Sequence, residues 1–382
     1  MKSDDFPPPQ GVETRTAGYR HGPGSHPARG PMPVLSPWDT TATTPTWTTT
    51  PFATPTAGAT SRGDPVSGLA RSAYTLGSTV PGGSGADLRA FDTMVRDADV
   101  VGVGAATYGS SEFCTVKHRL FRHLVEGQGF RSFVFGASWD AGVRLDAWVL
   151  RGTGHLRTIM DEEFRAGSGQ WNTTETRDLF RWMRTWNVRH PESPVRVAGN
   201  GADHADSALP GPTDEAALRH RDRGPADTTL WWQRHTGTKV FLSAHNSQVA
   251  AGPALPDRRP ATLGRLLREH LGSRYVNVGF TFGQGSFNAI DANAPGTPWR
   301  RFDVGPAMAH GSEDVLERVS RRDWYLDTRA VAAGTARDWL AAARPTRNIG
   351  AYRPCGEYEN TRLLPTHDII VHLHHIGPTH RR

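Results

Sequence analysis

His245 occupies the place in this sequence that best suits acid–base chemistry. It follows the apolar run Lys239–Leu242, which predicts a buried strand, and it precedes Asn246. Active sites of α/β proteins form at the carboxyl ends of parallel strands, and an imidazole exchanges protons near neutral pH. We therefore take His245 as a candidate base or acid, with a structural histidine at a strand end as the alternative.

A strand, a glycine-rich turn and a helix start follow one another in Val100–Phe113, VVGVGAATYGSSEF. A dinucleotide-binding turn has this order, but Thr107 stands where its third glycine is needed. No acidic residue closes the next strand, where Gly136 follows Phe135. The helix N-terminus can still hold an anion, and Glu112 in its first turn is either a functional carboxylate or a capping residue. The sequence does not favour a nucleotide cofactor.

Histidines are concentrated near the C-terminus, in VHLHHIGPTH. Strand alternation places His372 and His374 on one face, which permits a metal pair, with a polar strand face as the alternative. No third ligand stands at a recognisable spacing, so we assign no metal and no cofactor. There is no G-x-S-x-G elbow, and neither Cys114 nor Cys355 resembles a nucleophile.

The elements that must position these residues alternate between strands and helices. A helix over Ser111–Glu126 is expected to start at a cap formed by Ser110 or Ser111. This alternation predicts an α/β domain with a mostly parallel sheet flanked by helices. Further helices are expected over residues 140–150, 174–189, 262–271 and 336–343, and strands over 99–104, 133–135, 195–198, 239–242, 275–280 and 368–373.

Residues 1–64 form a separate region by composition. The segment Thr40–Thr60 is rich in threonine and proline and carries no charge, so it cannot bury enough apolar area to offset the entropy of ordering. We expect a disordered tail over residues 1–64 and one folded domain over 65–382.

Charge and hydropathy narrow the class of protein. The net charge of +6 comes from arginines scattered along 382 residues, and no basic run with interleaved aromatics favours nucleic acid. The sequence contains no stretch of 18 apolar residues, so we expect no membrane span. It has no apolar run near its N-terminus, so we expect no signal peptide. We expect a cytoplasmic protein with a small-molecule substrate or ligand, no nucleic-acid partner and no membrane association. Its oligomeric state stays open.

Several segments, in order along the chain, together resemble the erythromycin esterase family. The family motif G-E-A-T-H-G-x-x-E-F corresponds to GAATYGSSEF, Gly104–Phe113, and the closest match is Ile159–Asn187. Trp231–Ala250 is similar to the segment that ends A-H-N-x-H. The remaining similar segments are Phe135–Gly152, Gly283–Ala289 and Trp324–Ala330.

The resemblance implies an erythromycin-esterase-like fold over about residues 65–382. It also implies an enzyme that opens macrolide lactones with water activated by a histidine and carboxylates, in general without a metal. Between Gly199 and the segment RDRGPADTTLWW the family has a longer helical stretch, whereas only Asn200–His220 stand here. We therefore expect a shortened helical subdomain over the cleft.

Carried over residue by residue, the resemblance shows most acid–base positions replaced. The motif glutamate falls on Ala105, and the motif histidine falls on Tyr108, a phenol that is a poor base at neutral pH. The glutamate after the second strand falls on Gly136. Of the two histidines in A-H-N-x-H, the first is kept as His245 and the second falls on Gln248.

Other positions keep their type or their charge. Lys117 stands where the family often has arginine, so the charge survives without the bidentate fork. Glu112, Asn246, Asp327 and Arg329 match the pattern. We expect catalytic roles for His245, Tyr108, Glu112 and Lys117, and substrate-binding roles for Gln248, Asn246, Trp139 and Arg329.

Three functions remain open from the sequence. The first is a repurposed enzyme that catalyses a non-hydrolytic step on a polyketide-like or macrolide-like molecule in natural-product biosynthesis. In this enzyme His245 and Tyr108 would act as base and acid, and Lys117 or Gln248 would polarise a carbonyl. The second is a catalytically inactive relative that binds a small molecule or a partner protein. The third is a hydrolase that cleaves a macrolide lactone in an antibiotic response. Because an acid–base group contributes roughly 10²- to 10⁴-fold in rate, we rank hydrolysis last.

Overall fold

The computed structural model describes residues 63–164, 166–201, 215–252, 261–294, 298–353 and 357–382. The tail predicted over residues 1–64 lies outside these ranges except for its last two residues, so its disorder stays a prediction.

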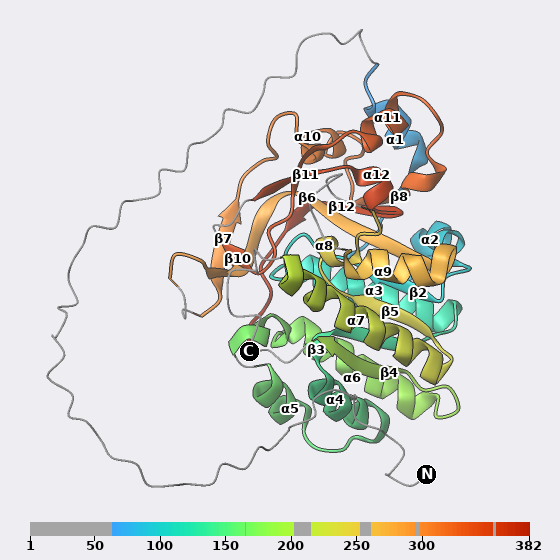
Figure 1. Cartoon of the computed structure of the whole chain (residues 1–382), viewed down its shortest axis with the longest axis vertical. Helices are drawn as coiled ribbons and strands as arrows, with labels where there is room; N and C mark the ends of the chain where they lie inside the picture. The colour runs from blue at the N-terminus through green and yellow to red at the C-terminus, as the bar shows by residue number, and fades with distance from the viewer. Residues whose placement is uncertain (1–62, 165, 202–214, 253–260, 295–297, 354–356) are drawn as a thin grey trace, which may run out of the picture. The chain divides into compact units, whose positions relative to one another are not determined.

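One mixed sheet runs through the described part of the chain, in the strand order β1-β8-β12-β6-β2-β5-β3-β4 (Figure 1). Neighbouring strands from β12 to β4 are parallel, while β8 and β1 continue one edge in antiparallel pairing. The predicted α/β class with a mostly parallel sheet is therefore confirmed. The strands of this path are β1 (Ala73–Thr75), β2 (Val100–Val103), β3 (Phe130–Ser138), β4 (Arg196–Gly201), β5 (Lys239–Ser243), β6 (Tyr275–Asp291), β8 (Trp324–Asp327) and β12 (Ile369–Ile376).

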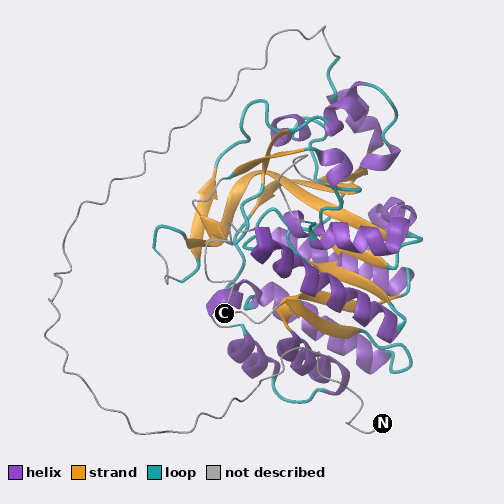
Figure 2. Cartoon of the chain, viewed as in Figure 1, coloured by secondary structure: helices purple, strands orange, loops and turns teal. Residues whose placement is uncertain are grey.

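Helices cover both faces of this sheet (Figure 2). On one face the apolar side chains of β2, β3 and β5 pack with α3 and α6, and on the other face those of the same strands pack with α7, α8 and α9. Near β8 and β12 the second face is covered by α1, α10, α11 and α12. The helices are α1 (Val66–Ser72), α2 (Arg89–Val95), α3 (Ser111–Gly127), α4 (Trp139–Arg151), α5 (Leu156–Glu163), α6 (Thr174–Arg189), α7 (Glu215–Thr236), α8 (Asn246–Val249), α9 (Leu263–Leu271), α10 (Ser312–Leu316), α11 (Thr335–Ala341) and α12 (Leu363–Thr366).

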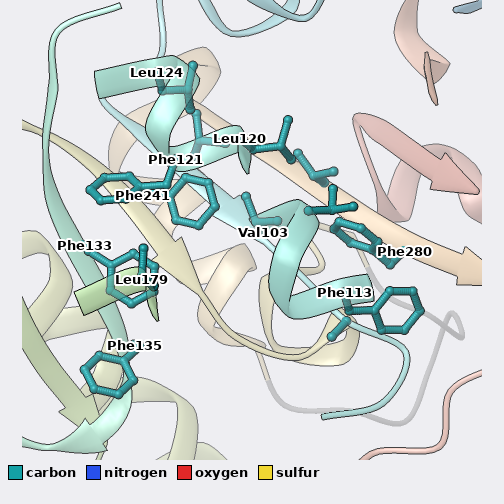
Figure 3. Close-up of a cluster of buried hydrophobic side chains, with 14 of the residues drawn as sticks. Val103, Phe113, Leu120, Phe121, Leu124, Phe133, Phe135, Leu179, Phe241 and Phe280 are labelled. Carbon is teal, nitrogen blue, oxygen red and sulfur yellow. The ribbon is translucent and has the colours of Figure 1, made fainter. Parts of the chain in front are cut away.

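The helix spacing read from the sequence accounts for the main core. In α3, Phe113, Leu120, Phe121 and Leu124 recur at helical spacing and are buried against the sheet (Figure 3). The Phe121 ring lies 5.3 Å from that of Phe241 on β5. Truncating a buried phenylalanine costs about 3–5 kcal/mol, so this contact fixes α3 on the sheet. The Ser110 hydroxyl caps α3 by accepting from the Phe113 amide.

Strand β6 is longer than its sequence pattern predicts. The apolar run predicts residues 275–280, but the strand continues to Asp291. Its first residues pair with β2, and from Val278 it pairs with β12. Beyond that it pairs with β7 (Arg300–Val304) and β10 (Tyr352–Arg353). These later partners accept and donate the backbone hydrogen bonds of this part of β6. The segment is polar and contains glycine, so its sequence does not predict a strand.

The helical cover after β4 is only partly described. Helix α7 follows β4 and packs against the sheet, while residues 202–214 lie outside the described ranges. The predicted shortening of this subdomain therefore stays a prediction. Among the described residues, no helix combines the length and the apolar character that a membrane crossing would need.

Candidate active site

The loop after β2 brings Tyr108 to the carboxyl ends of the central strands. The Thr107 hydroxyl donates to the carbonyl oxygen of Gly350 at 3.1 Å, and the Tyr108 amide donates to the same oxygen. A Cβ on Gly109 would lie 1.7 Å from the carbonyl oxygen of Asn288, so no larger residue fits there without moving the backbone. The loop is therefore fixed on both sides before it reaches α3.

Tyr108, His245 and Gln248 meet at this edge of the sheet, and we call them the tyrosine–histidine cluster. The Tyr108 hydroxyl donates to Gln248 Oε1 at 2.9 Å, and its ring lies 5.4 Å from the His245 imidazole. The other side of Tyr108 contacts the Trp171 indole at 5.9 Å. Positions 108 and 248 are 140 residues apart in the chain, yet their side chains form one hydrogen-bonded pair.

His245 is buried and is held at both ring nitrogens. It begins α8 in a capping box, in which Gln248 Oε1 accepts from the His245 amide at 3.1 Å. Nδ1 lies 2.9 Å from the Ser247 hydroxyl, and Nε2 lies 3.4 Å from the Ala106 carbonyl oxygen. A carbonyl oxygen only accepts, so the neutral ring carries its proton on Nε2 and presents the Nδ1 lone pair to Ser247.

Lys117 lies on α3 with its side chain buried, and it contacts the chain just before His245. Its ammonium donates to Ser243 Oγ at 3.2 Å and to the Ala244 carbonyl oxygen at 2.9 Å. Burial lowers the pKa of Lys117 to about 8. An ammonium has three N–H donors, so one donor remains beyond these two bonds for a carbonyl or anionic oxygen of a ligand.

A cavity of about 340 Å³, part of it open to solvent, is lined by Lys117, Trp171 and Glu175. Burial raises the pKa of the Glu175 carboxyl, but hydrogen bonds from His380 and Ser111 outweigh it, and the net pKa lies below its usual range. Cys114 also lines this cavity, and burial raises the pKa of its thiol to about 12, so it offers no thiolate.

A larger cavity, of about 700 Å³ including open solvent, lies on the side of α8 and α9. Ser247, Thr281 and His367 are among its lining residues. Burial lowers the pKa of His367 to about 4, so this imidazole is neutral at physiological pH. Ser247 connects this cavity to His245, while Trp171 connects the smaller cavity to Tyr108. The tyrosine–histidine cluster therefore adjoins both spaces.

Four predicted site residues have structural partners in this fold. Glu112 accepts from the Gly377 amide at 2.6 Å, which ties α3 to the end of β12. The Asn246 amide group bonds both backbone atoms of Phe280 on β6, although Asn246 also lines the larger cavity. Trp139 packs against Trp231 and Trp232 of α7. Arg329 pairs with Asp327 and with the Met94 carbonyl oxygen.

The structure therefore brings together Tyr108, His245 and Gln248, and Lys117 is joined to the backbone of the residue that precedes His245. Among the described residues, the partners of Glu112, Trp139 and Arg329 named above are all outside this group. Their assigned roles in catalysis and substrate binding stay predictions.

Two positions where the family resemblance implies carboxylates lie near the cluster. Ala105 is buried in the loop before Tyr108, and its carbonyl oxygen accepts from the Asn246 amide. Gly136 is half-buried on β3, and a Cβ there would lie 4.0 Å from the Trp171 indole. A side chain can therefore be added at position 136 without a close contact at Cβ.

Sequence reasoning missed three residues that shape this site. Trp171 lies in the short segment before α6, Glu175 lies in the first turn of α6, and Ser247 follows His245 by two residues. Ser247 had a sequence signal, since a hydroxyl two residues after a strand-end histidine can reach its imidazole. Trp171 and Glu175 had none, because only the packing of α6 places them beside β3 and β5.

Comparison with known proteins places this chain in one family. The sequence profile described as erythromycin esterase matches residues 125–210 and 204–376, more than half of the chain. The chain belongs to the erythromycin esterase family. The erythromycin esterase type II of Escherichia coli is 26% identical over 101 residues, a match that covers 26% of this chain and only 23% of that protein.

Solved structures support the erythromycin-esterase-like fold. A succinoglycan biosynthesis protein superposes with a TM-score of 0.74 at 22% identity, covering 85% of this chain and all of its own. A Bacillus cereus protein gives 0.71 at 20% identity, covering 83% of this chain and 98% of its own. A histidine-to-asparagine mutant of the erythromycin esterase EreC, in its open conformation, gives 0.59 at 14% identity, covering 80% and 97%. At these identities the likeness establishes the fold.

Proposed function

We propose that this erythromycin-esterase-like protein uses its tyrosine–histidine cluster in a non-hydrolytic step on a polyketide-like or macrolide-like small molecule. The observation that carries the proposal is the hydrogen bond from Tyr108 to Gln248 beside His245. By resemblance, positions 108 and 248 are those of two family histidines, and here they hold a phenol and an amide. The pair can donate and accept hydrogen bonds, but it is a poor base for activating water.

The remaining groups suit a substrate that carries a carbonyl group. Lys117 lines the smaller cavity, and its third N–H would polarise a carbonyl oxygen of a substrate bound there. The Tyr108 hydroxyl would protonate a developing oxyanion, and His245 would remove a proton from carbon or oxygen. Such a step needs the substrate to be positioned, and it consumes no water.

Ester hydrolysis is the second candidate, and a different observation favours it. Ser247 Oγ lies 2.9 Å from His245 Nδ1, while the Ala106 carbonyl oxygen orients the opposite ring nitrogen. A hydroxyl, a base and an orienting acceptor are the parts of a nucleophilic serine site. Ser247 would attack the lactone carbonyl, the ring oxygen would leave with the proton held by His245, and water would release the acyl group.

Mass spectrometry of erythromycin incubated with the full chain separates these candidates. A gain of one water indicates hydrolysis, a loss of one water indicates dehydration, and an unchanged mass at a new retention time indicates rearrangement. We expect no gain of water, together with saturable quenching of tryptophan fluorescence as the macrolide reaches Trp171. Hydrolysis that is rapid and is abolished in His245→Ala, but not in the surface control His375→Ala, would overturn the non-hydrolytic proposal.

Two further measurements identify the hydrolase with a serine nucleophile and the catalytically inactive binding protein. In the hydrolase candidate, Ser247→Ala removes turnover, and an acylated peptide containing Ser247 is trapped in the unmodified chain. Quenching by the macrolide without any product indicates the catalytically inactive binding protein.

A further inference from the structure

A glutamate and two histidines meet on the second face of the sheet, away from the tyrosine–histidine cluster. Glu317 follows α10 directly, and His372 and His374 point to one face of β12 with ring centroids 5.5 Å apart. Glu317 Oε1 lies 3.0 Å from His372 Nε2, and Glu317 Oε2 lies 2.7 Å from His374 Nδ1. We call these residues the glutamate–histidine cluster.

We propose that the glutamate–histidine cluster binds a divalent transition metal, of which zinc is the best fit. One ligand atom from each residue lies within 4.8 Å of the other two. Zinc takes imidazole nitrogens and carboxylate oxygens at about 2.0–2.2 Å in a tetrahedral arrangement. Donor atoms of such a tetrahedron lie about 3.4 Å apart, so the two Glu317 contacts, now at 3.0 and 2.7 Å, would lengthen by about 0.5 Å to admit the ion. A water can complete the four ligands because Glu317 and His374 are partly exposed.

The outer nitrogen of each imidazole has the partner that a metal ligand needs. His374 Nε2 lies 3.2 Å from the carbonyl oxygen of Arg322, which can only accept. The Nε2 proton is therefore fixed, and Nδ1 directs its lone pair at a carboxylate oxygen of Glu317. Two acceptors facing each other need a cation between them, either a proton or a metal ion. A ligating histidine that donates its other N–H to a backbone carbonyl is a common arrangement in metal sites.

His372 has an equivalent partner in Thr281 of β6. Thr281 Oγ1 lies 2.9 Å from His372 Nδ1 and 3.4 Å from the Val371 carbonyl oxygen. The hydroxyl can donate to Val371 and accept from Nδ1, which leaves His372 Nε2 free for a metal. His372 is fully buried and its ring lies 5.5 Å from the Trp324 indole, so its orientation is fixed by packing.

The backbone of β6 makes room for the carboxylate. A Cβ on Gly283 would lie 1.8 Å from Glu317 Oε1, so only glycine at this position lets Glu317 reach the two imidazoles. The proposed ligands thus come from the end of α10 and from β12, with Thr281 and Gly283 of β6 placing them. A bound ion would join the α10 segment to the sheet.

Zinc titration of the full chain tests the proposal. The protein is stripped with a chelator, dialysed and titrated with zinc chloride by calorimetry, and cobalt(II) absorption reports the ligand geometry. We expect one zinc per chain and the visible bands of tetrahedral cobalt(II). Because partners of the outer ligand nitrogen contribute 10- to 100-fold in affinity, we expect Thr281→Val to weaken binding by about that factor and His374→Ala to weaken it further.

The matched control is His375→Ala, which removes the exposed neighbouring histidine on the opposite strand face. Its zinc affinity and cobalt spectrum should equal those of the unmodified chain, and the melting temperature of each variant reports folding. Zinc binding that is absent in the unmodified chain, or unchanged in folded His374→Ala, or lost equally in His375→Ala, would overturn the proposal. If the unmodified chain binds no zinc, the cation between Glu317 and the two imidazoles is a proton.

Discussion

The tyrosine–histidine and glutamate–histidine clusters differ in the partner given to each imidazole. His245 contacts a serine hydroxyl, a carbonyl oxygen and the ring of Tyr108. His372 and His374 share the carboxylate of Glu317. A carboxylate raises the affinity of an imidazole for a cation, whether that cation is a proton or a metal ion. At the two positions where the resemblance implies carboxylates, the chain has Ala105 and Gly136, whereas the glutamate–histidine cluster contains the carboxylate of Glu317.

The largest expected effect comes from returning carboxylates and a base to the tyrosine–histidine cluster. The triple variant Ala105→Glu, Tyr108→His and Gly136→Glu should raise erythromycin hydrolysis at least ~100-fold, since one acid–base group contributes roughly 10²- to 10⁴-fold. The measured quantity is kcat/KM for ring-opened product. The same triple change combined with His245→Ala is the control. A folded triple variant without any gain would show that the two clusters differ by more than their carboxylates.

The next effect concerns Lys117, the buried cation whose ammonium donates to Ser243 Oγ and to the carbonyl oxygen of Ala244, the residue before His245. Lys117→Met should raise the free energy of unfolding at pH 7 by about 1–2 kcal/mol. Lowering the pKa of the buried ammonium from 10.5 to about 8 corresponds to about 3 kcal/mol, and the lost hydrogen bonds to Ser243 and Ala244 offset part of it. Chemical denaturation at a series of pH values measures this difference.

The pH dependence of this change has a definite sign. Between about pH 8 and 10.5 the unfolded chain keeps the Lys117 proton and the folded chain loses it, so the unmodified protein gains stability as the pH rises. The advantage of Lys117→Met should therefore shrink over this window. An advantage that grows with pH would contradict a Lys117 ammonium whose pKa is lowered by burial.

The smallest effect compares the hydrogen bonds of the two clusters directly. In metal-free protein, Glu317→Gln should lower the free energy of unfolding by about 1.5 kcal/mol, because it weakens two bonds to a charged acceptor. Tyr108→Phe removes one bond between neutral groups and should cost about 1 kcal/mol. Urea denaturation measures both. A larger loss of stability for Tyr108→Phe than for Glu317→Gln would mean that the hydrogen bond in the tyrosine–histidine cluster is the stronger one.

Local sequence patterns determined the helices and the sheet class. Helix α6 begins at Thr174 and ends at Arg189, as its spacing of apolar residues predicts, and Ser110 caps α3. These features follow from contacts within a few residues, and such contacts are written in the sequence. Alternation likewise predicted that His372 and His374 share a face, since side chains of a strand alternate between its faces.

Only the tertiary structure decided which chemical groups meet. Strand order and helix packing decide three contacts of the site. Tyr108 bonds Gln248, Lys117 bonds the carbonyl oxygen of Ala244, and Trp171 packs against Tyr108. The third member of the glutamate–histidine cluster, Glu317, stands 55 residues from His372 and at no recognisable spacing from it. The sequence alone named the residue types available for chemistry. The packing of the end of α10 beside β12 brought a carboxylate to two of the histidines. Long-range packing sets such distances, and no local pattern records them.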